Sequence, residues 1–318
     1  MDDDAPIRGE VRVADYRRVS HGLFLRLRDG LGDDEEFRRD LAAYLLVLPA
    51  DAVFTHVTAA RLLGWRLPQL PEQVPVFAAV QGDRRPRRPG LICSRLVREP
   101  EPRIMHGLPV DAAEEILLRA ARDLGILDLV IMIDSALELG HLAPAAMERL
   151  LETRRPGVAR LRAAYGLATE RCESAGETLL RLFHDAMEIA VRPQVELRDG
   201  SGRLIGRADL LVGGTTFVHE YDGAGHRDKL QHRADLRRER GWTGTPYVRR
   251  GFTLDDLLNH PGVVMHELDR ALGRPHLVSR LRVWRRMVDN SLYAEPGRAR
   301  VMNRWRRHMG VVDWAGTA

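Results

Sequence analysis

Three carboxylates and an imidazole fall within a short stretch that otherwise has the character of two apolar strands. Asp209 comes first, and Glu220, Asp222 and His226 follow it closely. Carboxylates gathered in this way repel one another unless a cation lies among them, and oxygen ligands suit Mg²⁺ or Mn²⁺. A bound divalent ion lowers the pKa of its water and stabilises charge on a phosphate. These residue types therefore predict metal-assisted hydrolysis of phosphodiesters.

A hairpin would have to position these acids. Side chains alternate along a strand, so Glu220 and Asp222 point to the same face. If Gly213-Gly214 forms a two-residue turn, Asp209 lies opposite Val218 and on that same face. The hydrolase hypothesis requires the acids to share this face, with no neighbouring guanidinium occupying them.

Each candidate also has a structural explanation. Strand-end acids such as Asp209 and Glu220 are often simply solvated, and Asp222 followed by glycine is typical of a turn. Glu177 ends the pattern Ser-x-x-Glu, so it either closes a helix cap or serves as a cation ligand, directly or in an outer shell. His226 is a candidate acid or base, or a residue at the start of a helix.

Basic clusters supply candidates for contact with nucleic acid. Lys229, the only lysine, lies one helical turn after His226 and could neutralise charge on a phosphate, although most lysines are simply exposed. A proline-spaced loop of four arginines cannot lie in a core and is a phosphate-contact candidate. The expected contacts are Arg84, Arg85, Arg87 and Arg88 in this loop and Lys229, Arg233, Arg237 and Arg238 in a later charged helix.

Composition places broad limits on the chain. Its 318 residues allow two domains, and 44% hydrophobic residues can form real cores. Two cysteines give no disulfide framework. The N-terminal residues lack the features of a signal peptide, and no apolar run is long enough to span a membrane, so we expect a cytoplasmic protein. The net charge of +4 is weak evidence for DNA binding. The basic residues are nearly all arginine in a chain rich in Ala and Gly, and this bias indicates a GC-rich coding sequence as much as a binding surface.

The pattern changes along the chain predict three segments. Residues 1–168 form a mixed, mostly helical region, residues 169–273 a compact α/β unit, and residues 274–318 an Arg-rich helical tail. Within the second segment we expect a helix from Ser174 to about 186, strands over 194–198, 203–211 and 216–221, a helix over 227–240, and a last strand near 247–249.

The motifs of the second segment resemble a bacterial domain family similar to very-short-patch-repair endonucleases. The matching motifs are Glu173-Ser-Ala-Gly-Glu177, Arg207-Ala-Asp209-Leu, His219-Glu220-Tyr-Asp222-Gly-Ala-Gly-His226, Asp235-Leu-Arg-Arg238 and Gly241-Trp242. Those endonucleases belong to the restriction-endonuclease-like superfamily with the core motif PD-(D/E)XK. The resemblance implies an α/β (α+β) fold, with a mixed sheet flanked by helices, and metal-dependent cleavage of DNA.

The resemblance also implies roles for individual residues. Asp209 matches the first acid of the motif and Glu220 the second, both as ligands of Mg²⁺ or Mn²⁺, and Glu177 matches the acid on the preceding helix. Asp222 stands where the superfamily has lysine and is expected to help place the ion. His226 would then take over proton transfer.

The N-terminal region is similar to antitoxins of the abortive-infection type, on the motif Thr55-His-Val-Thr-Ala-Ala-Arg and the segment around Val19. Two alternatives to an endonuclease therefore stay open. One is a non-catalytic DNA-binding regulator or antitoxin-like protein that uses the nuclease fold as a scaffold. The other is a protein partner in a defence module that does not bind DNA.

Overall fold

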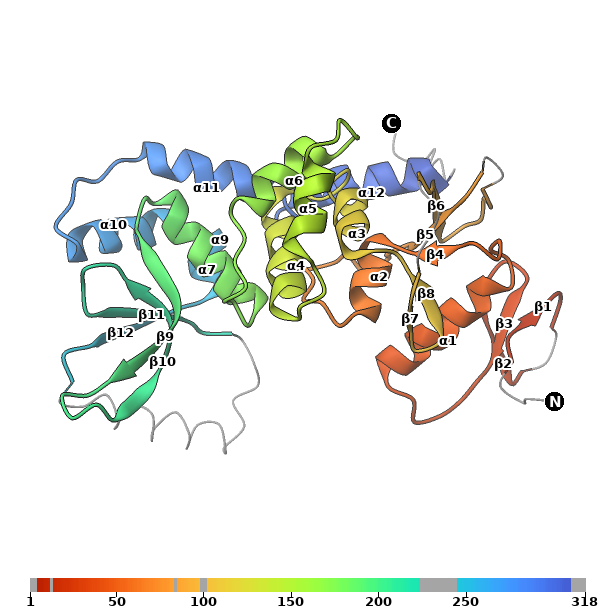
Figure 1. Ribbon diagram of the computed structural model, residues 1–318, viewed down its shortest axis with the longest axis horizontal. Helices are drawn as coiled ribbons and strands as arrows, with labels where there is room; N and C mark the ends of the chain where they lie inside the picture. Colours follow the sequence, from red (N-terminus) through yellow and green to blue (C-terminus); the bar gives the residue numbers. More distant parts are fainter. Residues whose placement is uncertain (1–4, 12–13, 83–84, 98–101, 224–244, 310–318) are drawn as a thin grey trace. The chain divides into compact units, whose positions relative to one another are not determined.

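The computed structural model describes residues 5–11, 14–82, 85–97, 102–223 and 245–309. The chain divides into two compact units (Figure 1). The first unit comprises residues 1–124, 142–161 and 298–318, and the second comprises residues 125–141 and 162–297. Residues 125–141, which precede the predicted α/β segment in sequence, group with the second unit.

A four-stranded mixed sheet forms the centre of the second unit. Its strands are β9 (Val191–Arg198), β10 (Leu204–Val212), β11 (Phe217–Tyr221) and β12 (Val248–Phe252). The order is β12-β11-β10-β9, in which β9, β10 and β11 are antiparallel neighbours and β12 runs parallel to β11. A parallel pair needs a crossover connection, so β11 and β12 are joined by a long stretch of chain.

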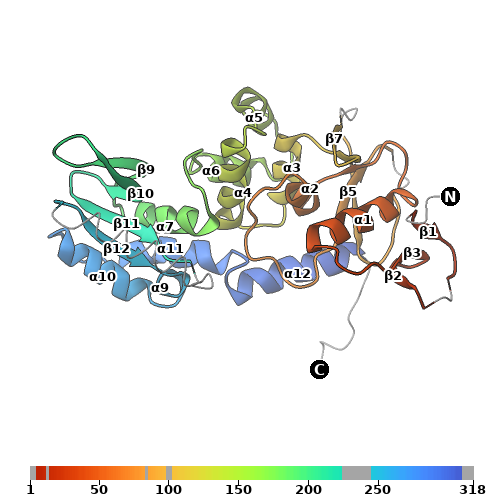
Figure 2. The ribbon, with the colours of Figure 1, turned by 90° about the horizontal axis from the view of Figure 1, so that it is seen from below.

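Helix α7 (Ala175–Ala186) covers one face of this sheet. Ser174 caps it by accepting a hydrogen bond from the backbone N–H of Glu177. The buried residues Leu179, Leu182 and Phe183 give the helix an apolar side. Helix α11 (Ser279–Asp289) lies on the side of α7 turned away from the sheet (Figure 1; Figure 2). Its buried Trp284 makes an edge-to-face contact with Phe183.

Helix α4 (Ile126–Glu138) completes the core of the second unit by packing against α7. Asp134, fully buried on α4, pairs with Arg181 at 3.0 Å and accepts a hydrogen bond from Thr178 at 2.9 Å. A buried charge needs such partners, since an unpaired one would cost several kcal/mol. The second unit also contains the helices α9 (Leu254–Leu258) and α10 (Pro261–Ala271).

The first unit contains two further sheets. One has the order β1-β3-β2 and the other β6-β5-β4-β8-β7. The strands are β1 (Ile7–Arg8), β2 (Tyr16–Ser20), β3 (Leu23–Arg26), β4 (Val53–Phe54), β5 (Val76–Val80), β6 (Leu91–Arg95), β7 (Arg103–Met105) and β8 (Leu108–Val110). The helices are α1 (Asp33–Leu45), α2 (His56–Leu62), α3 (Ala113–Ala120), α5 (Pro144–Leu151), α6 (Val158–Tyr165) and α12 (Glu295–Met309), of which α6 and α12 continue past the unit boundary.

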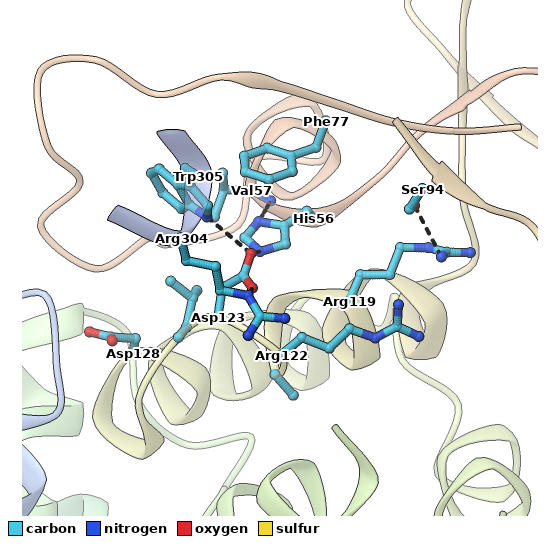
Figure 3. Close-up of polar contacts among 12 residues, drawn as sticks. His56, Val57, Phe77, Ser94, Arg119, Arg122, Asp123, Asp128, Arg304 and Trp305 are labelled. Atoms are coloured by element: carbon cyan, nitrogen blue, oxygen red, sulfur yellow. Dashed lines mark hydrogen bonds and ion pairs between the residues drawn. The ribbon is translucent and has the colours of Figure 1, made fainter. Parts of the chain in front are cut away.

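A polar cluster around Asp123 connects several elements of the first unit (Figure 3). Trp305 donates its indole N–H to Asp123 at 3.0 Å, Arg304 Nε lies 2.5 Å from the same carboxylate, and His56 Nε2 lies 3.3 Å from it. The His56 ring stacks on Phe77 with centroids 4.0 Å apart. This carboxylate is therefore surrounded by donors.

The molecule is thus a mixed α and β protein, as the sequence predicts at that coarse level. The N-terminal region, expected to be mostly helical, carries eight strands in its described part. Among the described residues, no helix has both the length and the apolar character needed to cross a bilayer.

Candidate functional site

Asp209 and Glu220 lie next to each other on neighbouring strands of the second unit's sheet. Leu210 pairs with His219 and Leu211 with Val218, so the following position sets Asp209 opposite Glu220. Directly opposite residues of an antiparallel pair point to the same face. The prediction that these two acids share a face is therefore confirmed.

The expected register of this hairpin was wrong by two residues, since Asp209 lies opposite Glu220 and not Val218. Strand β10 ends at Val212 and β11 begins at Phe217, which leaves four residues in the turn and not two. The hydroxyl of Thr215 closes this turn by donating to the Val212 carbonyl at 3.0 Å and accepting from the Phe217 N–H at 3.0 Å. A side chain that replaces backbone pairing lengthens the loop.

The row of residues through Asp209 and Glu220 continues across the whole sheet. On one side, the flanking pairs Leu210–Pro193 and Ala208–Val195 place Gln194 of β9 opposite Asp209. On the other side, Gly251 of β12 pairs with Glu220. Gln194, Asp209, Glu220 and Gly251 thus form one transverse row.

Asp209 is half-buried, and its carboxylate is under-compensated. Burial raises its pKa, the backbone N–H of Tyr221 opposes this by donating at 2.9 Å, and Glu177 and Glu220 raise it further, against Arg249, to about 6. Negative charge from two other acids therefore reaches Asp209. Carboxylates that disfavour one another's ionised form are characteristic of functional sites.

Glu177 reaches this row from the first turn of α7. Its backbone N–H donates to the Ser174 hydroxyl at 3.1 Å, as a capping box requires. Its carboxylate oxygen Oε2 accepts from the Glu173 N–H at 2.9 Å and from Gln194 Nε2 at 2.7 Å. Glu177 therefore takes part in the helix cap and is also held beside the acid row.

Gly176 lets this first turn approach the sheet closely. A Cβ atom at Gly176 would overlap with the aromatic ring of Tyr221 on β11. The absence of a side chain thus allows the N-terminus of α7, with Glu177, to lie against the strand that carries Glu220.

Glu220 is held by a guanidinium. Arg249 on β12 donates from Nε to Glu220 Oε2 at 2.5 Å, and its Nη2 contacts the same oxygen. Arg249 pairs in register with Val218 and is therefore on the face that carries Glu220. The Glu220 side chain is 10% exposed and that of Arg249 27%. The condition that no guanidinium should occupy the acids is not met at Glu220.

Asp222 lies at the exposed end of β11, two residues after Glu220 and on the same side of the strand. Its carboxylate covers Gly251, where a Cβ atom would overlap with it. Gly251 therefore provides the space in which Asp222 sits beside the row. The structure brings together four of the predicted site residues, Glu177, Asp209, Glu220 and Asp222.

The remaining predicted site residues fall into two sets. His226, Lys229, Arg233, Arg237, Arg238 and Arg84 lie outside the described residues. Arg85 and Arg87 are exposed and Arg88 is half-buried, all in the first unit.

The chemistry of the donor set suits a hard cation, but its present arrangement does not form a cage. Among the described residues, no three His, Cys, Asp or Glu side chains are gathered closely enough to hold a metal ion. Glu177, Asp209 and Glu220 each use one carboxylate oxygen in the hydrogen bonds above. Oxygen ligands of this type fit Mg²⁺ or Mn²⁺. A cation would require Arg249 to leave Glu220.

Two residues of the site were missed from the sequence. Gln194 adopts a left-handed backbone with φ of 53°, which is uncommon for a residue other than glycine and is found at constrained sites. Arg249 reaches Glu220 only through the parallel pairing of β11 with β12, which separates them by 29 positions in sequence. The only signal for this contact was an arginine at the end of a predicted strand.

A pair of histidines lies behind the site, on the face of β11 that packs against α7. His184 Nε2 and His219 Nδ1 are 2.8 Å apart, and His184 Nδ1 lies 2.8 Å from the Leu180 carbonyl. Because a carbonyl only accepts, His184 donates from Nδ1 and accepts from His219. Burial lowers the pKa of His184 to about 4 and that of His219 to about 3, so both rings are neutral at pH 7.

Comparison of the chain with protein-family models, with curated proteins and with solved structures gives no match.

Proposed function

We propose that this protein is a metal-dependent DNA endonuclease whose site is the acid row of the second unit. The observation that carries the proposal is the position of Asp209 opposite Glu220 on neighbouring strands, with Glu177 held beside them. Burial, Glu177 and Glu220 raise the pKa of the half-buried Asp209 to about 6. A divalent cation relieves such repulsion and activates water next to a phosphate. Asp209 and Glu220 would hold Mg²⁺ or Mn²⁺, with Asp222 helping to place it and Glu177 supporting the site.

The order of elements supports the same proposal. A capped helix, a three-stranded antiparallel meander and a fourth strand parallel to the third follow one another along the chain. This arrangement agrees with the restriction-endonuclease-like core that the motifs imply. His226, outside the described residues, is proposed as the general acid or base.

The test is cleavage of supercoiled and linear DNA with Mg²⁺ or Mn²⁺. We expect the wild-type protein to nick or cut DNA and Asp209→Ala and Glu220→Ala to abolish this. A matched control is Glu196→Gln, an exposed acid on β9 whose partner is Arg198. Cleavage by both alanine variants at the wild-type rate would rule out the assigned site.

The second candidate is a non-catalytic DNA-binding regulator or antitoxin-like protein, and the ion pair between Arg249 and Glu220 favours it. A guanidinium that permanently neutralises Glu220 would leave no position for a cation. In that case DNA binding should fall steeply with salt, because it depends on phosphate contacts, while no divalent ion produces strand breaks. Absence of a gel shift at low salt would instead favour a protein partner in a defence module.

A further inference from the structure

In the described structure, the positive charge beside the acid row is an arginine side chain of the protein. Arg249 is the residue whose guanidinium contacts Glu220, and its charge also lowers the pKa of Asp209. A fork of donors on one carboxylate is a strong, oriented interaction. Arg249 thus offsets part of the repulsion that a metal ion would offset.

Arg249 differs in its exposure from an arginine that is permanently buried with its partner. Its side chain is 27% exposed, so the guanidinium can return to solvent without crossing the core. By contrast, Arg181 is 8% exposed and its partner Asp134 is fully buried, which is typical of a structural pair. The contact between Arg249 and Glu220 is therefore exchangeable at moderate energetic cost.

We propose that Arg249 and a divalent cation are alternative occupants of Glu220, and that cation binding releases Arg249 to contact a DNA phosphate. The inference rests on the proposed endonuclease function. Arginine suits both roles, because its planar fork matches carboxylate and phosphate equally well. In the released state Arg249 remains on the face of the sheet that carries the acids, where the phosphate would lie.

The space around Arg249 agrees with this exchange. The residue two positions further along β12 is Gly251, which has no side chain and faces Glu220. Asp222 fills part of that space with its carboxylate. A guanidinium released from Glu220 would therefore move towards the carboxylate of Asp222 and not towards apolar side chains. Its positive charge would remain close to a negative one.

The test measures Mn²⁺ binding by calorimetry and DNA cleavage in wild-type protein, Arg249→Gln and Arg249→Lys. Removal of the competing charge in Arg249→Gln should tighten Mn²⁺ binding by about tenfold, a change equivalent to about 1.4 kcal/mol. The same variant should cleave DNA more slowly, because the phosphate contact is lost. Arg249→Lys, which keeps the charge but not the fork, should bind Mn²⁺ a few-fold more tightly than wild type.

A matched control is Arg192→Gln. Arg192 is exposed on β9 and belongs to the same transverse row as Arg249, through the pairs Leu211–Arg192, Leu211–Val218 and Val218–Arg249. The Arg192→Gln variant should leave Mn²⁺ binding unchanged. It thereby distinguishes competition at Glu220 from a general effect of losing one positive charge.

Two outcomes would overturn the inference. Unchanged or weaker Mn²⁺ binding in folded Arg249→Gln shows that Arg249 does not compete, and if this variant does not fold, unchanged binding in Arg249→Lys shows the same. When that result accompanies Mn²⁺ binding that Asp209→Asn abolishes, the proposed endonuclease site survives and only the role of Arg249 fails. When neither wild type nor Arg249→Gln binds Mn²⁺, the metal site itself fails.

Discussion

Asp123 in the first unit and Asp209 in the second are both partly buried carboxylates, yet their surroundings are opposite in character. Asp123 is surrounded by the donors of His56, Arg304 and Trp305. Burial alone would raise its pKa, but His56, Trp305 and Arg304 together hold that pKa below its ordinary value. Its charge is fully compensated inside the protein.

Asp209 has one backbone donor, Tyr221, and two acids among the groups that influence it. Its pKa is about 6, well above the ordinary value for aspartate. Burial of an acid therefore does not by itself indicate function. A compensated acid such as Asp123 holds elements together, whereas an under-compensated one such as Asp209 is available for a ligand of positive charge.

The largest expected effect is a loss of stability of the second unit in acid, caused by its buried histidines. His184 and His219 contact each other and, among the described residues, no carboxylate, whereas His56 lies beside Asp123. The pKa values of His184 and His219 fall to about 4 and about 3 in the folded protein, so the unfolded state binds more protons below pH 6.5. Stability contributed by each is complete above pH 6.5 and is lost as the pH falls, by about 1.4 kcal/mol per pH unit.

At pH 5 the two rings together should therefore lower the free energy of unfolding of the second unit by about 4 kcal/mol. The second unit should then unfold at a higher pH than the first. Hydrogen exchange followed by mass spectrometry, resolved by peptide, measures this order. His184→Leu combined with His219→Leu should flatten the pH dependence, whereas His260→Gln, an exposed histidine, should not change it. Simultaneous opening of both units in acid would contradict the role given to the histidine pair.

The next largest effect is expected from Asp123→Asn. Loss of the charge leaves Arg304 without its anion and weakens the contacts of His56 and Trp305. We expect the free energy of unfolding of the first unit to fall by about 2 to 4 kcal/mol, as when one partner of a buried pair is removed. Denaturant titration measures the change, with the exposed Asp29→Asn as control. A loss as small as that of the control would show that the cluster is not structural.

The smallest change in the free energy of unfolding is expected from Asp209→Asn, the same substitution as Asp123→Asn but in the second unit. The raised pKa means that ionised Asp209 destabilises the folded state, by an amount that grows as the pH rises from about 4 to about 6. Asparagine keeps an acceptor for the Tyr221 N–H without the charge. This variant should stabilise the second unit at pH 7 by about 1 to 2 kcal/mol, after allowance for solvent that reaches the half-buried group.

The same chemical change should thus have opposite signs in the two units. At pH 4 most of the stabilisation by Asp209→Asn should be lost, because Asp209 is then protonated in the folded state and only partly ionised in the unfolded state. Denaturant titrations at pH 4 and pH 7 test this directly. Destabilisation at pH 7 would mean that Asp209 is as well compensated as Asp123.

Local patterns in the sequence predicted much of the site's framework. The cap at Ser174, the strand over 216–221 and the shared face of Asp209 and Glu220 follow from capping chemistry and the two-residue period of strands. The register was missed, because the Thr215 hydroxyl replaces a backbone bond in the turn. No periodicity carries information of that kind.

Contacts between distant segments were not predictable from local pattern. Arg249 reaches Glu220 across a parallel pair, and His184 meets His219 across the interface between α7 and β11. Each depends on which elements become neighbours, which single-sequence patterns do not specify. Residues 125–141 join the second unit through the pair of Asp134 with Arg181, another contact of this kind.

The central claim is that the acid row of the second unit takes a divalent cation. Electron paramagnetic resonance of Mn²⁺ counts the ions bound per chain in wild-type protein, Asp209→Asn and the control Glu196→Gln. We expect the wild type and the Glu196→Gln control to bind Mn²⁺, and we expect Asp209→Asn not to bind it. Equal binding by all three proteins, or none by the wild type, would contradict it.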